Sequence, residues 1–385
     1  MMQPFTLLIG GCTMHEAEVI ESVLKKHLMM NAARIKFLAC FIVALLKVSS
    51  VNLTKVALAF PGKAEKASKY KKIQRFFHHF ALDLNMVAKL IAALILDQLD
   101  TWLLAIDRTN WKFGKTNINV LTLGVAYNGS AIPLIWIPLS KRGNSNTAER
   151  ISLLSLFLSI FSVDKIKCLT ADREFIGEDW FSFLIKKGIS FRIRIRQNML
   201  VSNSRGILVP AHTLFRMLKV GEYMILEGRR SVSGLELFVI GVRLPDGEYL
   251  ILVCDKEPET ALDDYKQRWE IETFFGCLKT RGFDFESTHM TEPKRIQKLV
   301  ALLAITYCWC IYTGEWLNSR KQIKVKKHGR KENSIFRYGL DELREILLNI
   351  STRFSDYKKK VQLFFGSLNP SYRLVNDPTS LLCCK

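Results

Sequence analysis

Two aspartates each close an apolar run that is typical of a β-strand. Asp107 ends the run WLLAID, Asp172 ends the run IKCLTAD, and an arginine follows each of them directly. A carboxylate at the carboxyl end of a strand lies where sheet enzymes hold their reacting groups. On its own, each aspartate is also typical of a turn or a helix cap. The pair predicts that two strand ends of one sheet bring two carboxylates together.

A third carboxylate lies on a stretch whose spacing predicts one helix, from about residue 257 to 281. At 100° per residue, one stripe about 60° wide holds Tyr265, Arg268, Glu272 and Lys279. The neighbouring stripe is apolar and consists of Ile271, Phe274, Phe275 and Leu278. A solvent-facing helix would place its charges opposite the core, so this pattern favours a site. An ordinary ion pair between Arg268 and Glu272, four residues apart, is the alternative interpretation.

Carboxylates from two strand ends and a helix suit two Mg²⁺ or Mn²⁺ ions, which prefer oxygen ligands. We therefore expect Asp107, Asp172 and Glu272 to bind the metal ions and to be catalytic. Two ions about 3.5 to 4 Å apart activate a water or sugar hydroxyl and stabilise the leaving oxygen of a phosphodiester. Glu174, two residues beyond Asp172, is a further potential ligand or supporting partner.

The polar neighbours of Glu272 suit the recognition of phosphate. Arg268 would hold a flanking phosphate by a bidentate fork, and Lys279 would hold one as a point charge. Tyr265 could donate to a phosphate oxygen or stack on a displaced base. Tyr265, Arg268 and Lys279 are thus the predicted DNA-binding residues.

The elements that must position these residues follow from the apolar patterning. Strands are predicted at 102–107, 118–127, 132–139, 166–172 and 191–197, with helices at 147–161 and 178–187. Asn128 and Gly129 mark a hairpin turn between the second and third strands. Three meandering strands followed by alternating helices and strands predict an α/β fold with a mixed sheet.

The chain divides into four zones. We expect a helical, basic DNA-binding region at 1–99, a catalytic core at 100–197 and 255–290, an all-β insertion at 198–254, and a helical, basic C-terminal region at 291–385. Within the first zone the helical pattern is interrupted at Pro61 and Gly62 and then carries a cluster of lysines. Within the last, seven Lys or Arg and no acid lie between Arg320 and Lys331. A solvated charged surface is the alternative for both basic stretches.

Composition restricts the class of partner. The 385 residues carry 56 Lys and Arg against 36 Asp and Glu, a formal charge of +20, which favours nucleic acid first and an acidic membrane surface second. The longest apolar run, residues 37–46, is too short to cross a bilayer, which needs about 18 residues or more. The nine cysteines form no zinc-type spacing, and their odd number indicates reduced thiols. We expect a cytoplasmic protein without a secretion signal or a membrane partner.

Three ordered motifs resemble one known family. The spacing Y-x2-R-x3-E-x6-K, read at Tyr265, Arg268, Glu272 and Lys279, is similar to the YREK signature of bacterial insertion-sequence transposases with a DDE catalytic triad. The segments DRTNWKFG at 107–114 and TADREF at 170–175 resemble the blocks around the first and second aspartates of that family. The resemblance spans about residues 102–316.

The resemblance implies a ribonuclease H-like core with a β insertion before the glutamate. It also implies that Asp107, Asp172 and Glu272 bind the metal ions, while Tyr265, Arg268 and Lys279 grip the DNA of the element's ends. Members of the family bind terminal inverted repeats, cleave the ends by hydrolysis and join the 3′ ends to target DNA by strand transfer. They act as dimers in a synaptic complex, here expected on the bacterial nucleoid. A related nuclease without strand transfer, or an inactive DNA-binding relative, is the alternative.

Overall fold

The computed structural model describes residues 14–327 and 329–366. These residues form two compact units, one of residues 98–275 and the other of residues up to 97 together with those from 276 onward. Each unit is described by itself, beginning with residues 98–275, because they contain most of the predicted site.

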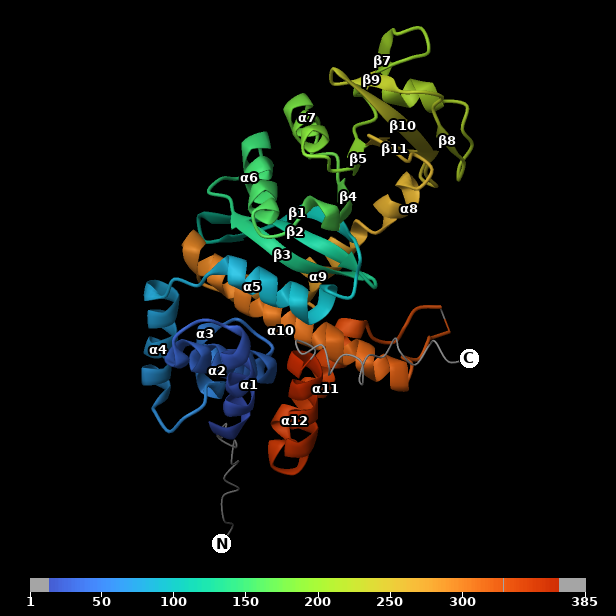
Figure 1. Ribbon diagram of the computed structural model, residues 1–385. Helices are drawn as coiled ribbons and strands as arrows, with labels where there is room; N and C mark the ends of the chain where they lie inside the picture. Colours follow the sequence, from blue (N-terminus) through green and yellow to red (C-terminus); the bar gives the residue numbers. More distant parts are fainter. Residues whose placement is uncertain (1–13, 328, 367–385) are drawn as a thin grey trace. The chain divides into compact units, whose positions relative to one another are not determined.

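The unit of residues 98–275 is built on one mixed sheet (Figure 1), with strands in the order β3-β2-β1-β4-β5-β11-β10-β9-β6-β7 and β8 paired with β10. The first five strands are β1 (Trp102–Phe113), β2 (Thr116–Tyr127), β3 (Ser130–Pro138), β4 (Ile166–Ala171) and β5 (Phe191–Ile195). β1, β2 and β3 form an antiparallel meander, while β4 runs parallel to both β1 and β5. The predicted strands and the mixed α/β class are confirmed.

The turn between β2 and β3 is formed by Asn128 and Gly129, both with positive φ, of 51° and 87°. Such a two-residue turn matches the right-handed twist of the flanking strands, as the sequence predicted. The bounds of β1 differ from the prediction, because β1 continues to Phe113 and Asp107 lies within it. However, the parallel pairing of β1 with β4 ends at Ile106 and Ala171, so both aspartates directly follow that ladder.

The remaining strands lie between β5 and the next helix, and the first four are short: β6 (Leu200–Ser202), β7 (Leu208–Pro210), β8 (Tyr223–Ile225), β9 (Arg230–Val232), β10 (Leu235–Arg243) and β11 (Tyr249–Cys254). β10 and β11 form an antiparallel hairpin, and β11 continues the sheet at β5. A single 3₁₀ turn, Ala211–Phe215, interrupts the strands of this segment.

Two helices, α6 (Thr147–Leu158) and α7 (Glu178–Lys186), lie side by side over one face of the sheet (Figure 1). Asn146 and Glu149 cap the start of α6 reciprocally, which satisfies backbone N–H groups that would otherwise lack a partner. The single helix predicted at 257–281 is wrong. The chain instead forms α8 (Ala261–Lys266) and α9 (Trp269–Leu278).

The other unit is helical. Its elements before residue 98 are α1 (Met14–His27), α2 (Ala32–Val48), α3 (Leu53–Ala59), α4 (Lys66–His79), α5 (Leu84–Ile91) and a π-helical turn (Ala92–Leu96). Those after residue 275 are a 3₁₀ turn (Phe285–Ser287), α10 (Pro293–Arg320), α11 (Ile335–Leu348) and α12 (Ile350–Gly366). The predicted interruption near Pro61 is confirmed, since α3 ends before it and α4 begins after it.

The centre of this unit is the contact of α10 with α11. A Cβ atom on Gly339 would lie 1.8 Å from the Cys310 carbonyl oxygen, so only glycine permits this approach of the two backbones. The described residues of the basic stretch after α10 are not helical. Within this stretch, Val325 and Lys331 form an isolated antiparallel β-bridge.

By length and composition alone, α10 could cross a membrane, and two bent helix pairs would pass the same test if each were one span. In α10, 89% of the most apolar window is buried inside the protein. The search of the sequence for one uninterrupted apolar run did not identify α10 as long and apolar enough to span a membrane. Polar residues such as Thr306 divide its apolar sequence. Six cysteines within the described ranges are buried and free, as expected for reduced thiols: Cys40, Cys168, Cys254, Cys277, Cys308 and Cys310.

Candidate active site

The two aspartates reach neighbouring positions through strand register. Ile106 of β1 pairs with Ala171 of β4, and Asp107 and Asp172 are the next residues on these two parallel strands. Parallel strands present their carboxyl ends at one edge, so the two carboxylates share this part of the sheet. The sequence predicted this convergence, although Asp107 lies inside a longer strand.

Arg268 joins the first aspartate to the glutamate. Its Nη2 donates to Glu272 Oε1 at 2.7 Å, and its Nη1 lies 3.6 Å from Asp107 Oδ2. The Arg268 residue is 5% exposed, and its buried Nη1 has no hydrogen-bond partner. A 3.6 Å separation is an ion pair and not a hydrogen bond. The guanidinium therefore lies as a partly satisfied positive charge between two carboxylates.

The break between α8 and α9 sets this position of Arg268. Arg268 lies in the turn between the helices, where its N–H donates to the Tyr265 carbonyl oxygen three residues earlier. Tyr265, near the end of α8, donates from its hydroxyl to Asp172 Oδ1 at 3.4 Å. Five of the six predicted site residues are thus linked within residues 98–275.

Lys279, the sixth predicted site residue, follows α9 and belongs to the other unit. There its Nζ pairs with Glu286 Oε1 at 2.8 Å. Its predicted contact with DNA stays a prediction.

Burial is the main influence on the charge of Asp107. It raises the pKa of this carboxyl to about 7, against the Arg108 N–H bond and the Arg268 guanidinium, which both lower it. The nearby carboxylates of Glu174 and Glu272 raise the Asp107 pKa further. Burial likewise raises the pKa of the Tyr265 hydroxyl to about 12, so this group is a proton donor at neutral pH. Perturbed groups of this kind are typical of functional sites.

Two supporting arginines were not predicted from the sequence. Arg108 Nε donates to both oxygens of Glu174, at 3.1 and 2.9 Å, so Glu174 is engaged in an ion pair. Arg150, buried on α6, donates to the backbone carbonyl oxygens of Glu174 and Ile176 and so fixes the loop after Asp172. The sequence held two signals for these roles: Arg108 directly follows Asp107, and Arg150 is a charged residue within the apolar pattern of α6.

Glu270 holds the start of α9 against the sheet. Its carboxylate accepts hydrogen bonds from the backbone N–H groups of Tyr127 and Gly129, in the β2–β3 turn. Burial raises the pKa of this carboxyl, and the two N–H groups lower it. Because Glu270 and Glu272 are on the same helix, this clamp helps to orient the predicted catalytic glutamate.

A family model described as the transposase DDE domain matches residues 98–309, more than half of the chain. The chain belongs to this family. It is accordingly a DNA transposase of the DDE superfamily. A search of the curated proteins finds no match. Among solved structures, it is similar to one described as a piggyBac transposase synaptic complex with hairpin DNA, at 14% identity and a TM-score of 0.41, over 93% of this chain and 75% of that one.

Transposases of this superfamily generally use divalent metal ions. Within residues 14–327 and 329–366, no three His, Cys, Asp or Glu side chains are spaced to hold a metal ion. The donor types nevertheless fit, because Asp107 and Glu272 already face one positive charge, that of Arg268, and oxygen donors suit Mg²⁺ and Mn²⁺. In the transposase, Asp107, Asp172 and Glu272 are therefore the candidate ligands.

Proposed function

We propose that this transposase cleaves the ends of an insertion sequence by metal-dependent phosphodiester hydrolysis and joins the freed 3′ ends to target DNA. The observation that carries the proposal is the convergence of Asp107 and Asp172 at adjacent register positions, with Glu272 tied to Asp107 through Arg268. Carboxylates brought together from separate strands and a helix are the donors that such chemistry requires.

A ribonuclease H-like core is part of the proposal. The strand order β3-β2-β1-β4-β5, with an antiparallel meander followed by two parallel strands, supports it. The strands β6 to β11 lie in the sequence between β5 and α8, which supports a β insertion ahead of the glutamate.

Asp107, Asp172 and Glu272 would hold the two Mg²⁺ or Mn²⁺ ions, whose chemistry is to activate the attacking water or hydroxyl and to stabilise the leaving oxygen. The Arg108 N–H, 2.7 Å from Asp107 Oδ1, orients that carboxylate. Arg268 Nη1, buried and without a hydrogen-bond partner, can donate to a phosphate oxygen. The protonated Tyr265 hydroxyl donates its one hydrogen bond to Asp172 Oδ1 and so helps to orient that carboxylate.

The YREK spacing supports the finer parts of the proposal. These are recognition of terminal inverted repeats, a phosphate contact by Lys279, a homodimer in the synaptic complex, and action in a bacterial cytoplasm on nucleoid DNA, without a membrane partner. The exposed lysines of α4 support a role for the N-terminal helices in DNA binding, since Lys66 and Lys71 face solvent.

The deciding experiment uses the DNA that flanks the coding region. Purified protein is incubated with a duplex carrying the terminal inverted repeat and with a supercoiled plasmid, with and without Mg²⁺, and products are separated on a gel. We expect metal-dependent cleaved ends and joined products. Glu272→Gln should reduce both by about 10³-fold or more, because it removes a ligand charge and leaves the fold intact.

Each alternative predicts a different result. Cleavage without joining would assign the chain to nucleases. Binding without cleavage would assign it to DNA-binding relatives that have lost activity. Full joining by Glu272→Gln would remove Glu272 from the triad. Glu236→Gln, at an exposed glutamate of β10 outside the carboxylate cluster, is the matched control and should keep cleavage.

A further inference from the structure

A row of arginines follows one face of β5. Arg192, Arg194 and Arg196 alternate with apolar residues in the sequence FRIRIR. Arg192 and Arg194 project to the same face of β5, because they are two residues apart on the strand, and Arg196 directly follows its last residue, Ile195. Exposure increases along the row, from buried Arg192 through half-buried Arg194 to exposed Arg196. The row therefore leads from the interior of the unit to solvent.

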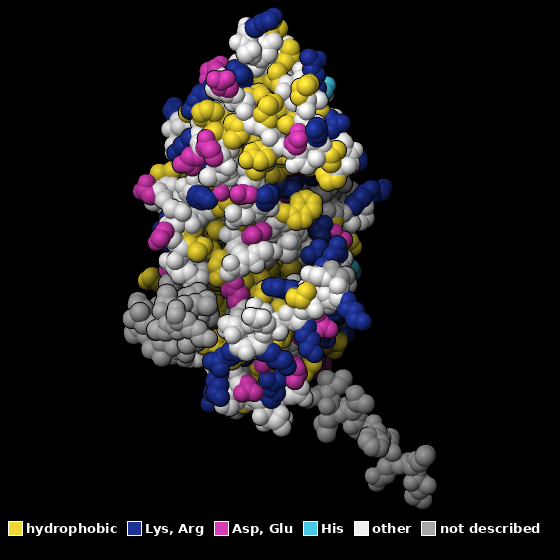
Figure 2. All heavy atoms as spheres, turned by 90° about the vertical axis from the view of Figure 1, so that its right-hand side faces the viewer, with side chains coloured by type: hydrophobic (Ala, Val, Ile, Leu, Met, Phe, Trp, Pro, Cys, Tyr) yellow, Lys and Arg dark blue, Asp and Glu magenta, His cyan; other side chains and the backbone are white. Residues whose placement is uncertain are grey.

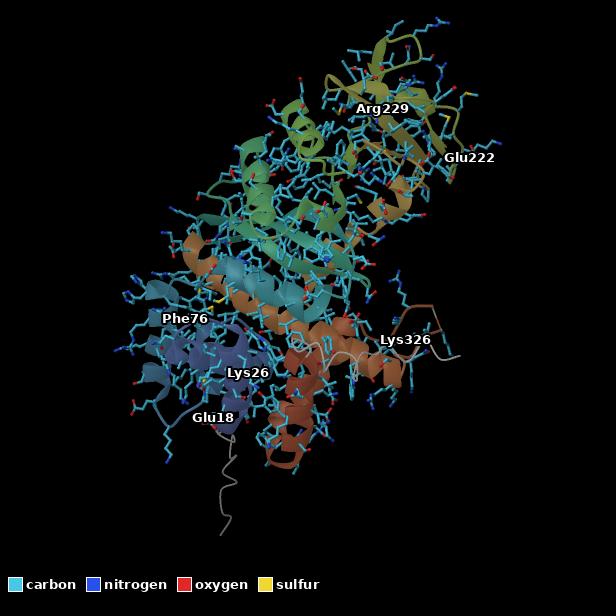
Figure 3. All side chains as sticks on the ribbon, in the orientation of Figure 1. Glu18, Lys26, Phe76, Glu222, Arg229 and Lys326 are labelled. Carbon is cyan, nitrogen blue, oxygen red and sulfur yellow. The ribbon has the colours of Figure 1, made fainter. Side chains whose placement is uncertain are left out.

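Only the buried end of this row is neutralised. Arg192 pairs with Asp264 at 3.3 Å, with Glu257 at 3.3 Å and with Asp255 at 3.9 Å. Neither Arg194 nor Arg196 makes a hydrogen bond or ion pair through its side chain anywhere in the described part of the chain. Arg229, labelled on the insertion in Figure 3, is by contrast hydrogen-bonded, because it donates to two backbone carbonyl oxygens.

The two unpaired arginines line one cavity with a third. A pocket of about 250 Å³ is bordered by Arg173, Arg194, Ile195, Arg196, Gln197, Asn198, Glu248 and Tyr249. Arg173 directly follows Asp172 and also has no ion pair or side-chain hydrogen bond among the described residues. Three arginines thus border a cavity that has one acidic residue, Glu248, in its lining, and an anion would stabilise this excess of positive charge.

The cavity adjoins the candidate active site. Arg173 is next to the candidate ligand Asp172 in the sequence. Ala171 of β4 pairs with Ile193 of β5, and Asp172 and Arg194 are the next residues along these two parallel strands. An anion in this cavity would therefore lie beside the carboxylates, on the same unit. In a DNA transposase, the anion nearest to the reacting phosphate is the neighbouring phosphate of the DNA backbone.

We propose that Arg173, Arg194 and Arg196 bind a phosphodiester of the DNA backbone close to the one that reacts. The proposal depends on the proposed function in one respect, namely that the DNA bound is the end of the element. Arginine suits it because its planar fork can donate two hydrogen bonds to one phosphate. Gln197 and Asn198 also border the cavity, and their side-chain amides are neutral hydrogen-bond donors.

The test compares Arg196→Gln and Arg194→Gln with wild type, using the full chain and duplexes with the element's end at several salt concentrations without Mg²⁺. We expect each substitution to weaken binding about tenfold and to reduce the salt slope by about one. Arg196→Lys keeps the charge and should retain most of the slope. Arg205→Gln, an exposed arginine that does not line the cavity, is the matched control and should leave affinity nearly unchanged.

A second measurement identifies the phosphate. Each phosphate of the duplex is replaced in turn by a neutral methylphosphonate, and binding is measured for wild type and for Arg196→Gln. At one position, the methylphosphonate should weaken binding by wild type and leave binding by Arg196→Gln unchanged. The reason is that the neutral phosphate and the arginine substitution remove the same contact. Strictly additive losses at every position would overturn the proposal, as would variants that bind like wild type.

The remaining outcomes distinguish a phosphate of DNA from free phosphate in the cavity. If Arg194 and Arg196 variants bind DNA normally and lose only protection from thermal unfolding by inorganic phosphate, the cavity takes free phosphate and the proposal is overturned. If wild type shows the predicted phosphate contact but neither cleaves nor joins DNA in Mg²⁺, the site stands and the proposed strand transfer fails. Unfolding temperatures equal to wild type for all variants exclude misfolding as the cause.

Discussion

At the scale of single residues, Asp107 is held against the preference of a carboxylate for water. Its pKa is raised to about 7, with burial as the main cause. An unfolded chain ionises this group near its usual pKa of about 4. Because the folded pKa is higher, ionisation opposes folding: stability is lost as pH rises from about 4 to about 7 and stays reduced above it. A residue retained under this penalty is typical of a functional site.

Replacing Asp107 should therefore stabilise the protein while removing activity. We expect Asp107→Asn to increase the free energy of unfolding by about 2 kcal/mol near pH 8 and to give little gain near pH 4, where the wild-type group is neutral. Urea denaturation at the two pH values measures this. Asp263→Asn is the control, because Asp263 is exposed and its pKa is lowered by Lys266. A loss of stability at both pH values would mean that Asp107 has a structural role.

At the scale of elements, the attachment of α9 to the sheet is the step that orients Glu272. Glu270 accepts from two backbone N–H groups of the β2–β3 turn, at Tyr127 and Gly129. Glu270→Ala should leave both donors without their partner and reduce the free energy of unfolding by about 2 to 3 kcal/mol.

Cleavage kinetics distinguish orientation from simple destabilisation. Glu270→Ala should lower the rate of cleavage at temperatures where the variant is fully folded, and Glu270→Gln, which keeps one acceptor oxygen, should recover part of it. Glu272→Gln should differ in its effect on stability. It should abolish activity and leave the free energy of unfolding nearly unchanged, because Glu272 is half-buried and pairs with Arg268 alone among the described groups. Equal rates for Glu270→Ala and wild type would exclude the clamp from catalysis.

The sequence predicted elements better than their breaks and pairings. Alternating apolar residues were enough to locate β1 to β5, and the turn at Asn128 and Gly129 followed from local chemistry. The break at Arg268 was not predictable, because helical periodicity continues across it. It is nevertheless this break that places the Arg268 guanidinium between Asp107 and Glu272. The register of Ile106 with Ala171 is a long-range pairing, which local spacing does not encode.

At the scale of the whole molecule, the formal charge of +20 is the dominant feature. Lys and Arg side chains are spread over the face shown in Figure 2 and not confined to one segment. Such a distribution predicts sequence-independent attraction to DNA that weakens steeply with salt. If six or more phosphates are contacted, affinity should fall about 10³-fold or more between about 50 and 200 mM salt.

The lysines of α4 have two interpretations, a DNA-binding surface and a solvated charged surface. The contribution of α4 to the attraction for DNA distinguishes them. Lys71 and Arg75 are exposed and border a cavity of about 690 Å³ within the helical unit, together with His78 and His289. If α4 contacts DNA, the double substitution Lys71→Gln and Arg75→Gln should reduce the salt slope by about two. The control replaces Lys55 and Lys89, which are exposed on α3 and α5 and do not line this cavity. A slope equal to wild type would make α4 a solvated surface and leave end recognition to other elements.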